Sequence, residues 1–145
     1  MLSPEMKAAV REEWRKLGFF YDRDDDTKTW KIVGDRKGIE RFIQEVTRFT
    51  SDPRNERPSE HEHLGPYLYL KLMSWPENRI DEQGIAGPLS ELRRMAFTIR
   101  EGLLRAADAQ KIFLRQSFAP NSEYELCIEL RPGPFDAAGE DAGCR

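Results

Sequence analysis

The residues best suited to chemistry are His61 and His63, the only histidines in the chain, which stand two positions apart in Ser-Glu-His-Glu-His-Leu-Gly. Side chains at i and i+2 of a β-strand lie on one face, so this pair can in principle bind one metal ion. Zinc usually takes a third protein ligand, here a carboxylate or a cysteine, and no second spaced motif supplies one. The alternative is a polar rim in which the histidines bond to the backbone beside Glu60 and Glu62. We expect that rim, with no metal, cofactor or catalytic residue, and keep a small metal-dependent enzyme using His61 and His63 as the alternative function.

The two cysteines do not change this expectation. Cys127 needs a basic neighbour to become a nucleophile, whereas Glu125 and Glu129 flank it on the same face of an expected strand. The chain contains no phosphate-binding loop, no G-x-S-x-G motif and no H-E-x-x-H motif. Two cysteines make no disulfide framework, and the N-terminal residues lack an apolar leader segment. We therefore expect a reduced, cytoplasmic protein that is not an enzyme.

The charge distribution argues against two classes of partner. The net charge is −3, of which residues 132–145 contribute −2, so the remaining body is close to neutral. A nearly neutral body gives no electrostatic reason to bind nucleic acid or an anionic membrane. No window approaches the 18 apolar residues of a membrane span. We expect an unknown protein partner, with no nucleic acid and no membrane.

The acidic run Asp24-Asp25-Asp26 resembles a calcium loop at first sight. The EF-hand pattern, however, requires spaced carboxylates, a central glycine and a final glutamate between two helices, and none of these is present. The run is better explained as a solvated turn between two β-rich segments. Together with Glu60 and Glu62, these aspartates are our candidates for facing a basic partner.

Periodicity and turn signals predict a two-layer α+β domain in which three helices pack on an antiparallel sheet of about five strands. The expected order is α-β-β-α-β-α-β-β. Residues 1–131 form this single domain, and the Gly- and Pro-rich residues 132–145 form a flexible tail whose deletion costs little stability. The expected helices are residues 4–17, a second opened by Asp35 and ended at Ser51, and a third opened by Pro88; the expected strands are residues 19–21, 29–34, 67–75, 111–118 and 124–131, with residues 51–62 as a loop.

Two apolar residues of the third helix lie outside its buried stripe. Phe97 and Leu104 are separated by seven positions, so they share a helical face. They either pack beneath the first helix, the alternative we favour, or form an exposed patch for a partner. Because two-fold dimers are the commonest soluble oligomers, a weak homodimer through this face is also a hypothesis.

One segment carries a family resemblance. Residues 85–96, Ile-Ala-Gly-Pro-Leu-Ser-Glu-Leu-Arg-Arg-Met-Ala, continue into a helix and are followed by Asn-Ser-Glu-Tyr at 121–124. This pattern resembles the small immunity proteins of bacterial toxin systems, in which such a helix precedes a short antiparallel strand pair. The likeness covers about a third of the chain and leaves out the N-terminal half. It implies a bacterial protein that neutralises a toxin by binding it.

Overall fold

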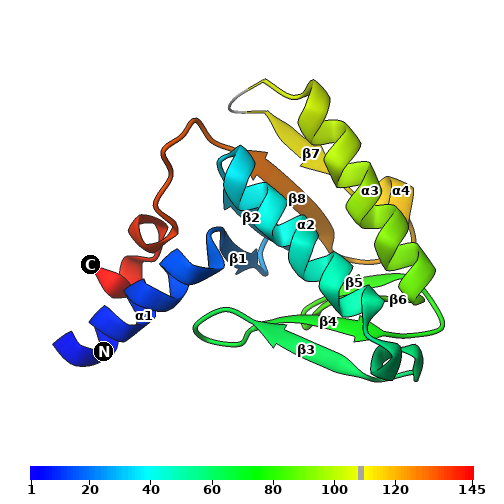
Figure 1. The fold of residues 1–145 in the computed structure, drawn as a ribbon, viewed down its shortest axis with the longest axis horizontal. Helices are drawn as coiled ribbons and strands as arrows, with labels where there is room; N and C mark the ends of the chain where they lie inside the picture. The colour runs from blue at the N-terminus through cyan, green and yellow to red at the C-terminus, as the bar shows by residue number, and fades with distance from the viewer. Residues whose placement is uncertain (108–109) are drawn as a thin grey trace.

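A computed structural model describes residues 1–107 and 110–145 (Figure 1). The α+β class is confirmed, but the elements within these residues form two four-stranded mixed sheets and four helices instead of one antiparallel sheet and three helices. In chain order, the elements are α1 (Pro4–Leu17), β1 (Phe20–Asp24), β2 (Thr29–Gly34), α2 (Arg36–Ser51), η1 (Pro53–Glu56), β3 (His61–Leu64), β4 (Leu70–Ser74), β5 (Arg79–Asp81), β6 (Gly84–Gly87), α3 (Leu89–Arg105), β7 (Lys111–Phe113), α4 (Arg115–Phe118), β8 (Glu125–Leu130), η2 (Ala137–Glu140) and η3 (Ala142–Cys144).

The three long helices lie close to where their capping residues and periodicity predict. The Ser3 hydroxyl accepts a hydrogen bond from the Met6 amide at 3.1 Å, which caps α1. Gly18 ends α1 in the left-handed region, at φ +87°, where a side chain would be strained. The Asp35 carboxylate caps α2 by accepting a bond from the Gly38 amide at 2.8 Å.

The first sheet has the strand order β1-β2-β8-β7. β1 and β2 form the expected antiparallel hairpin, with Tyr21 opposite Ile32. β2 then pairs in parallel with β8, so that Ile32 lies opposite Ile128. A parallel pair needs a crossover connection, and here that connection holds α2, α3 and the entire second sheet. The expectation of a purely antiparallel sheet is therefore wrong.

The second sheet has the order β3-β4-β6-β5, and β4 and β6 are its parallel pair. β4 is an interior strand, as the apolar run around Leu70 and Leu72 predicts. β3 begins at His61, at the end of a segment that we expected to be a loop. β5 and β6 lie in a turn-rich segment for which no strand was expected. Strands of three or four residues are too short to show a period, which is why the sequence pattern does not reveal them.

The expected strand over residues 111–118 is also corrected. β7 ends at Phe113, and α4 then forms one helical turn that buries Phe118. The Glu125 carboxylate accepts a bond from the Arg115 amide at 2.7 Å, at the start of that turn. The alternation of apolar residues thus continues past the end of the strand. Phe118 is buried as part of a helical turn, and its place in the alternation does not reveal this.

Helices α2 and α3 lie side by side and build the core against the sheets (Figure 1). Ile32 and Ile128 on the helix-facing side of the first sheet are completely buried. None of the described helices is long and apolar enough to cross a membrane. The buried apolar residues of α2 and α3 are Ile39, Phe42, Ile43, Val46, Phe49, Leu92, Met95, Ala96, Ile99 and Leu103.

The C-terminal segment lies against α1 as the two short 3₁₀ helices η2 and η3. The Asp141 carboxylate accepts hydrogen bonds from Trp14 Nε1 at 2.8 Å and from the Tyr67 hydroxyl at 2.7 Å. The division into a domain of residues 1–131 and a flexible tail of residues 132–145 stays a prediction. In the structure, however, part of this segment belongs to the hydrophobic core. Its buried side chains are Ala137, Ala138 and Cys144.

Candidate functional site

The two histidines share one face of β3, as their spacing predicts, and each ring is bonded to the backbone. Their ring centroids lie 5.1 Å apart in an edge-to-face arrangement. His61 Nδ1 lies 3.0 Å from the Ser59 carbonyl oxygen, and His63 Nδ1 lies 3.0 Å from the Leu68 carbonyl oxygen. These are the contacts that the polar-rim alternative describes.

A metal centre needs more than this pair. In residues 1–107 and 110–145, no three histidine, cysteine or carboxylate side chains are grouped to hold a metal ion. The metal-dependent enzyme therefore lacks a third ligand in this part of the chain and stays a prediction. Cys127 is buried, and that burial raises the pKa of its thiol; Lys111 lowers the pKa and Glu129 raises it further. The thiol is protonated at neutral pH and is a poor nucleophile.

The β1–β2 turn uses two of its three aspartates to hold its own shape. Asp24 Oδ1 accepts a hydrogen bond from the Asp26 amide at 2.9 Å, as in an Asx turn. Asp25 accepts a bond from the Tyr124 hydroxyl at 2.8 Å and pairs with Arg23 at 2.8 Å. The Tyr124 bond and then Arg23 hold the Asp25 pKa below its usual value, so this carboxylate is ionised. The Asp26 side chain is exposed.

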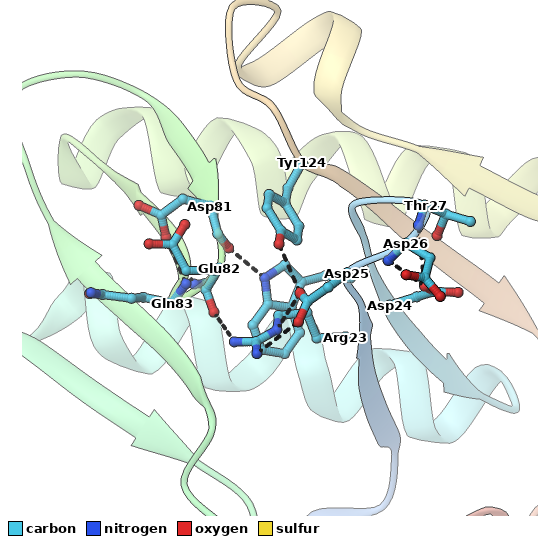
Figure 2. A network of polar contacts seen from close by, with 11 residues as sticks. Arg23, Asp24, Asp25, Asp26, Thr27, Asp81, Glu82, Gln83 and Tyr124 are labelled. Carbon is cyan, nitrogen blue, oxygen red and sulfur yellow. Dashed lines mark hydrogen bonds and ion pairs between the residues drawn. The ribbon is translucent and has the colours of Figure 1, made fainter.

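Arg23 connects this turn to the second sheet (Figure 2). Its guanidinium donates a hydrogen bond to the Glu82 carbonyl oxygen, and its central carbon lies 5.9 Å from the centroid of the Trp30 ring. Trp30 Nε1 in turn donates to the Asp81 carbonyl oxygen at 2.7 Å. The β5–β6 turn, which carries Asp81 and Glu82, is thereby held beside the aspartates of the β1–β2 turn (Figure 2).

Carboxylates from three separate segments consequently meet in one region, which we call the acidic surface. A groove of about 320 Å³ lies between the β5–β6 turn and the loop before β8, and four of its lining residues are acidic. Lys28 pairs with Glu123 at 2.6 Å, which places that loop beside the β1–β2 turn as well. With four basic neighbours, the region has a net charge of −3. Its acidic residues are Asp24, Asp25, Asp26, Glu77, Asp81, Glu82 and Glu123, and its basic residues are Arg23, Lys28, Arg79 and Arg115.

A second cavity, of about 300 Å³, opens beside the acidic surface, among residues of α1, β1 and the loop between β3 and β4. We call it the aromatic cleft. Its rings range from Trp14, which is 1% exposed, to Tyr69, which is 66% exposed. Asp22, Arg23 and Asp141 add charged groups to the lining. The aromatic lining residues are Trp14, Phe20, Tyr21, Trp30, Tyr67 and Tyr69.

The polar atoms of Trp14, Tyr21 and Tyr67 in the cleft form hydrogen bonds within the protein. The Tyr21 hydroxyl donates to the Leu64 carbonyl oxygen at 2.7 Å and accepts from the Tyr69 amide at 3.2 Å. The Trp14 indole and the Tyr67 hydroxyl both donate to Asp141. What the cleft offers a ligand is therefore ring surface and carboxylate charge.

No family model, curated protein or solved structure matches this chain. The resemblance of residues 85–96 and 121–124 to immunity proteins of bacterial toxin systems stays a prediction. The acidic surface and the aromatic cleft are therefore the features that point to a function.

The candidate carboxylates Glu60, just before β3, and Glu62, within β3, lie apart from the acidic surface. Glu62 pairs with Arg48 of α2 at 2.8 Å, and Glu60 lines a separate pocket beside η1. β3 and β5 form opposite edges of the second sheet. At about 4.8 Å per strand, some 14 Å separates these two strands. The structure thus brings Asp24, Asp25 and Asp26 together with Asp81 and not with Glu60 or Glu62.

Phe97 and Leu104 project from α3 into solvent, with 61% and 75% of their surfaces exposed. Packing beneath the first helix, the alternative that we favoured, is therefore wrong. Ion pairs flank them along the helix, with Arg94 bonded to Glu91 at 3.0 Å and Arg105 to Glu101 at 3.2 Å. They are two separate apolar side chains on a charged helix face.

Sequence reasoning missed most of the acidic surface and all of the aromatic cleft. A usable signal existed for part of the surface, because Glu77, Asp81 and Glu82 are concentrated in a six-residue segment. No local signal connects that segment to the β1–β2 turn, since the connection depends on Arg23 and Trp30. The cleft combines α1, β1, β2, the loop between β3 and β4, and Asp141 near the C-terminus, which are distant in sequence.

Proposed function

We propose that this protein is a non-enzymatic binding domain whose acidic surface docks on a basic region of another protein. One observation carries the proposal: Arg23 and Tyr124 hold the β1–β2 turn, the β5–β6 turn and the loop before β8 together, so that the carboxylates of these segments lie in one region. Segments that are already held in place lose little conformational freedom when a partner binds. A concentrated negative field also steers a basic partner during encounter and selects against acidic ones.

The ionisation state of the acidic surface supports binding over catalysis. Lys28 lowers the pKa of Glu123, and Tyr124 lowers that of Asp25, so both are permanent anions at neutral pH. A general acid or base works best when its pKa is near the operating pH. These groups are instead suited to accept hydrogen bonds from cationic side chains.

The resemblance to immunity proteins supplies the class of partner. In that setting, the basic partner is a toxin of a bacterial system, and the encounter takes place in the cytoplasm. Inhibition then follows from surface complementarity, without any reaction by this protein.

Charge neutralisation provides a direct test, using deca-lysine as a basic probe in calorimetric titrations at low salt. The variant D26N/E77Q/E82Q/E123Q should bind it at least about tenfold more weakly than wild type, because four anions at the contact are lost. The matched control E5Q/E12Q/E13Q/E56Q changes the net charge by the same amount on exposed residues elsewhere, and its affinity should stay within about threefold of wild type. Equal weakening in both variants would show that the probe responds to overall charge, which contradicts a localised binding surface.

The exposed residues of α3 offer a second contact, either for the foreign partner or for another copy of the chain. Phe97→Glu should change the thermal midpoint by less than about 2 °C, since the side chain lies in solvent and surface changes rarely exceed 0.5 kcal/mol. Sedimentation of both proteins at micromolar concentrations then tests the dimer. A wild-type dimer that becomes a folded monomer in the variant supports self-association through α3, whereas two monomeric proteins contradict it and leave these side chains to a foreign partner.

A further inference from the structure

We infer that the aromatic cleft receives an arginine side chain of the basic partner. This inference rests on the proposed function and gives that partner a specific anchor. It follows from three properties of the cleft: its ring surfaces, its net charge and its position next to the acidic surface.

The ring surfaces suit a planar cation. Trp14 and Tyr21 are buried, and the Trp14 ring centroid lies 4.9 Å from that of Phe20 and 5.1 Å from that of Tyr21. The ring most open to a ligand is Tyr69, which is 66% exposed and stacks on Tyr67 with centroids 5.5 Å apart. The faces of such rings carry negative potential and attract guanidinium groups, which also stack on them. The chain itself shows this preference nearby, because Arg23 lies over Trp30.

The charges in the cleft favour a cation as well. Asp22 and Asp141 line it, and among residues 1–107 and 110–145 Arg23 is the only basic residue that does so; it is paired with Asp25. Burial alone would raise the pKa of Asp141, but hydrogen bonds from Tyr67, then Trp14, outweigh this effect and lower the pKa. The cleft therefore keeps two carboxylates against one internally paired guanidinium. Both Asp141 oxygens already accept hydrogen bonds within the protein, so this carboxylate contributes its charge. The exposed Asp22 carboxylate can accept two parallel N–H groups from a guanidinium, which an ammonium group cannot supply in that geometry.

The size and position of the cleft fit one long side chain of a larger partner. A volume of about 300 Å³ is at the lower limit of cavities that enclose a drug-sized molecule. Arg23 belongs to both the cleft and the acidic surface, so one partner can cover both. Interfaces commonly place an aromatic or arginine anchor in a pocket and surround it with polar contacts.

Indole NMR signals of ¹⁵N-labelled protein test the inference, since the chain has three tryptophans and two of them line the cleft. Trp75→Phe removes and thereby identifies the third signal. Hexa-arginine should shift the Trp14 and Trp30 signals and leave that of Trp75 in place. Tyr69→Ala should weaken hexa-arginine binding at least about fivefold and hexa-lysine binding less than twofold. Tyr69→Phe, which keeps the ring, should retain wild-type affinity.

The outcomes separate this inference from the proposed function. If both peptides bind, and the four-carboxylate variant weakens them, while the Trp14 and Trp30 signals stay fixed and Tyr69→Ala has no effect, the arginine anchor is refuted and the acidic surface stands. If neither peptide binds wild-type protein, the proposed function fails together with the anchor. Equal effects of Tyr69→Ala on both peptides would refute selectivity for arginine.

Discussion

Deletion of residues 132–145 should lower the thermal midpoint by about 10 °C, far beyond the change of less than about 3 °C that a flexible tail predicts. The segment covers Trp14 and buries side chains of its own, including Cys144. Losing this apolar burial and the bonds to Asp141 should cost on the order of 4 kcal/mol. For a chain of this length, each kcal/mol corresponds to roughly 3 °C. Differential scanning calorimetry of the two proteins measures the shift.

A single substitution isolates the centre of that contact. Asp141→Ala leaves Trp14 Nε1 and the Tyr67 hydroxyl without their acceptor, which should cost about 2–4 kcal/mol. Asp136→Asn is the matched control on the same segment, because its ion pair with Arg15 is about half exposed on each side and contributes less than about 1 kcal/mol. A deletion variant as stable as wild type would restore the interpretation of residues 132–145 as a dispensable tail.

Gly84→Ala should destabilise the protein by about 3 kcal/mol or more. Gly84 has φ +142°, a conformation in which an L side chain is strained, and its added Cβ would lie 2.1 Å from the Lys71 carbonyl oxygen. That oxygen belongs to the backbone of β4, so the clash can be relieved only by separating β4 from β6. Urea denaturation gives the change in the free energy of unfolding.

Gly139→Ala provides the control for this effect. An added Cβ there meets no heavy atom within 4 Å, so its effect should stay within about 0.5 kcal/mol. If both alanine variants have the same stability as wild type, β4 and β6 do not approach as closely as the structure has them.

Local chemistry explains which elements are predictable. Ser3, Gly18 and Asp35 place helix ends through bonds to the nearby backbone, and strand β8 shows a clear alternation of apolar residues. The division into two sheets has no local signature. β2 pairs in parallel with β8 across a long crossover that includes α2 and α3. The hydrophobic pattern of a strand does not reveal which strand lies beside it.

In the candidate site as well, local features are predictable from the sequence and long-range contacts are not. The sequence correctly indicates a turn at Asp24, because its side chain bonds to the backbone two residues later. The nearness of Asp81 depends on contacts made by Trp30, which no spacing encodes. The role of Asp141 is hidden by its Gly- and Ala-rich surroundings. Small residues usually indicate a mobile tail, but here Ala137 and Ala138 are buried, and their size allows the backbone to lie close to α1.

The contact between α1 and residues 137–145 also affects the cleft. Trp14 and Asp141, which form one wall of the cleft, move apart whenever this contact opens. α1 buries only Trp14 completely, and it is tied to the last residues by bonds from Lys7 and Arg11 to the Arg145 and Cys144 carbonyl oxygens. A helix with so little buried surface opens more readily than the core, and its partner segment opens with it. We therefore expect this wall of the cleft to be the first part of the protein to open. A ligand that binds the cleft only when this wall is closed would therefore keep α1 and residues 137–145 together for longer. It would do so even without touching either end of the chain.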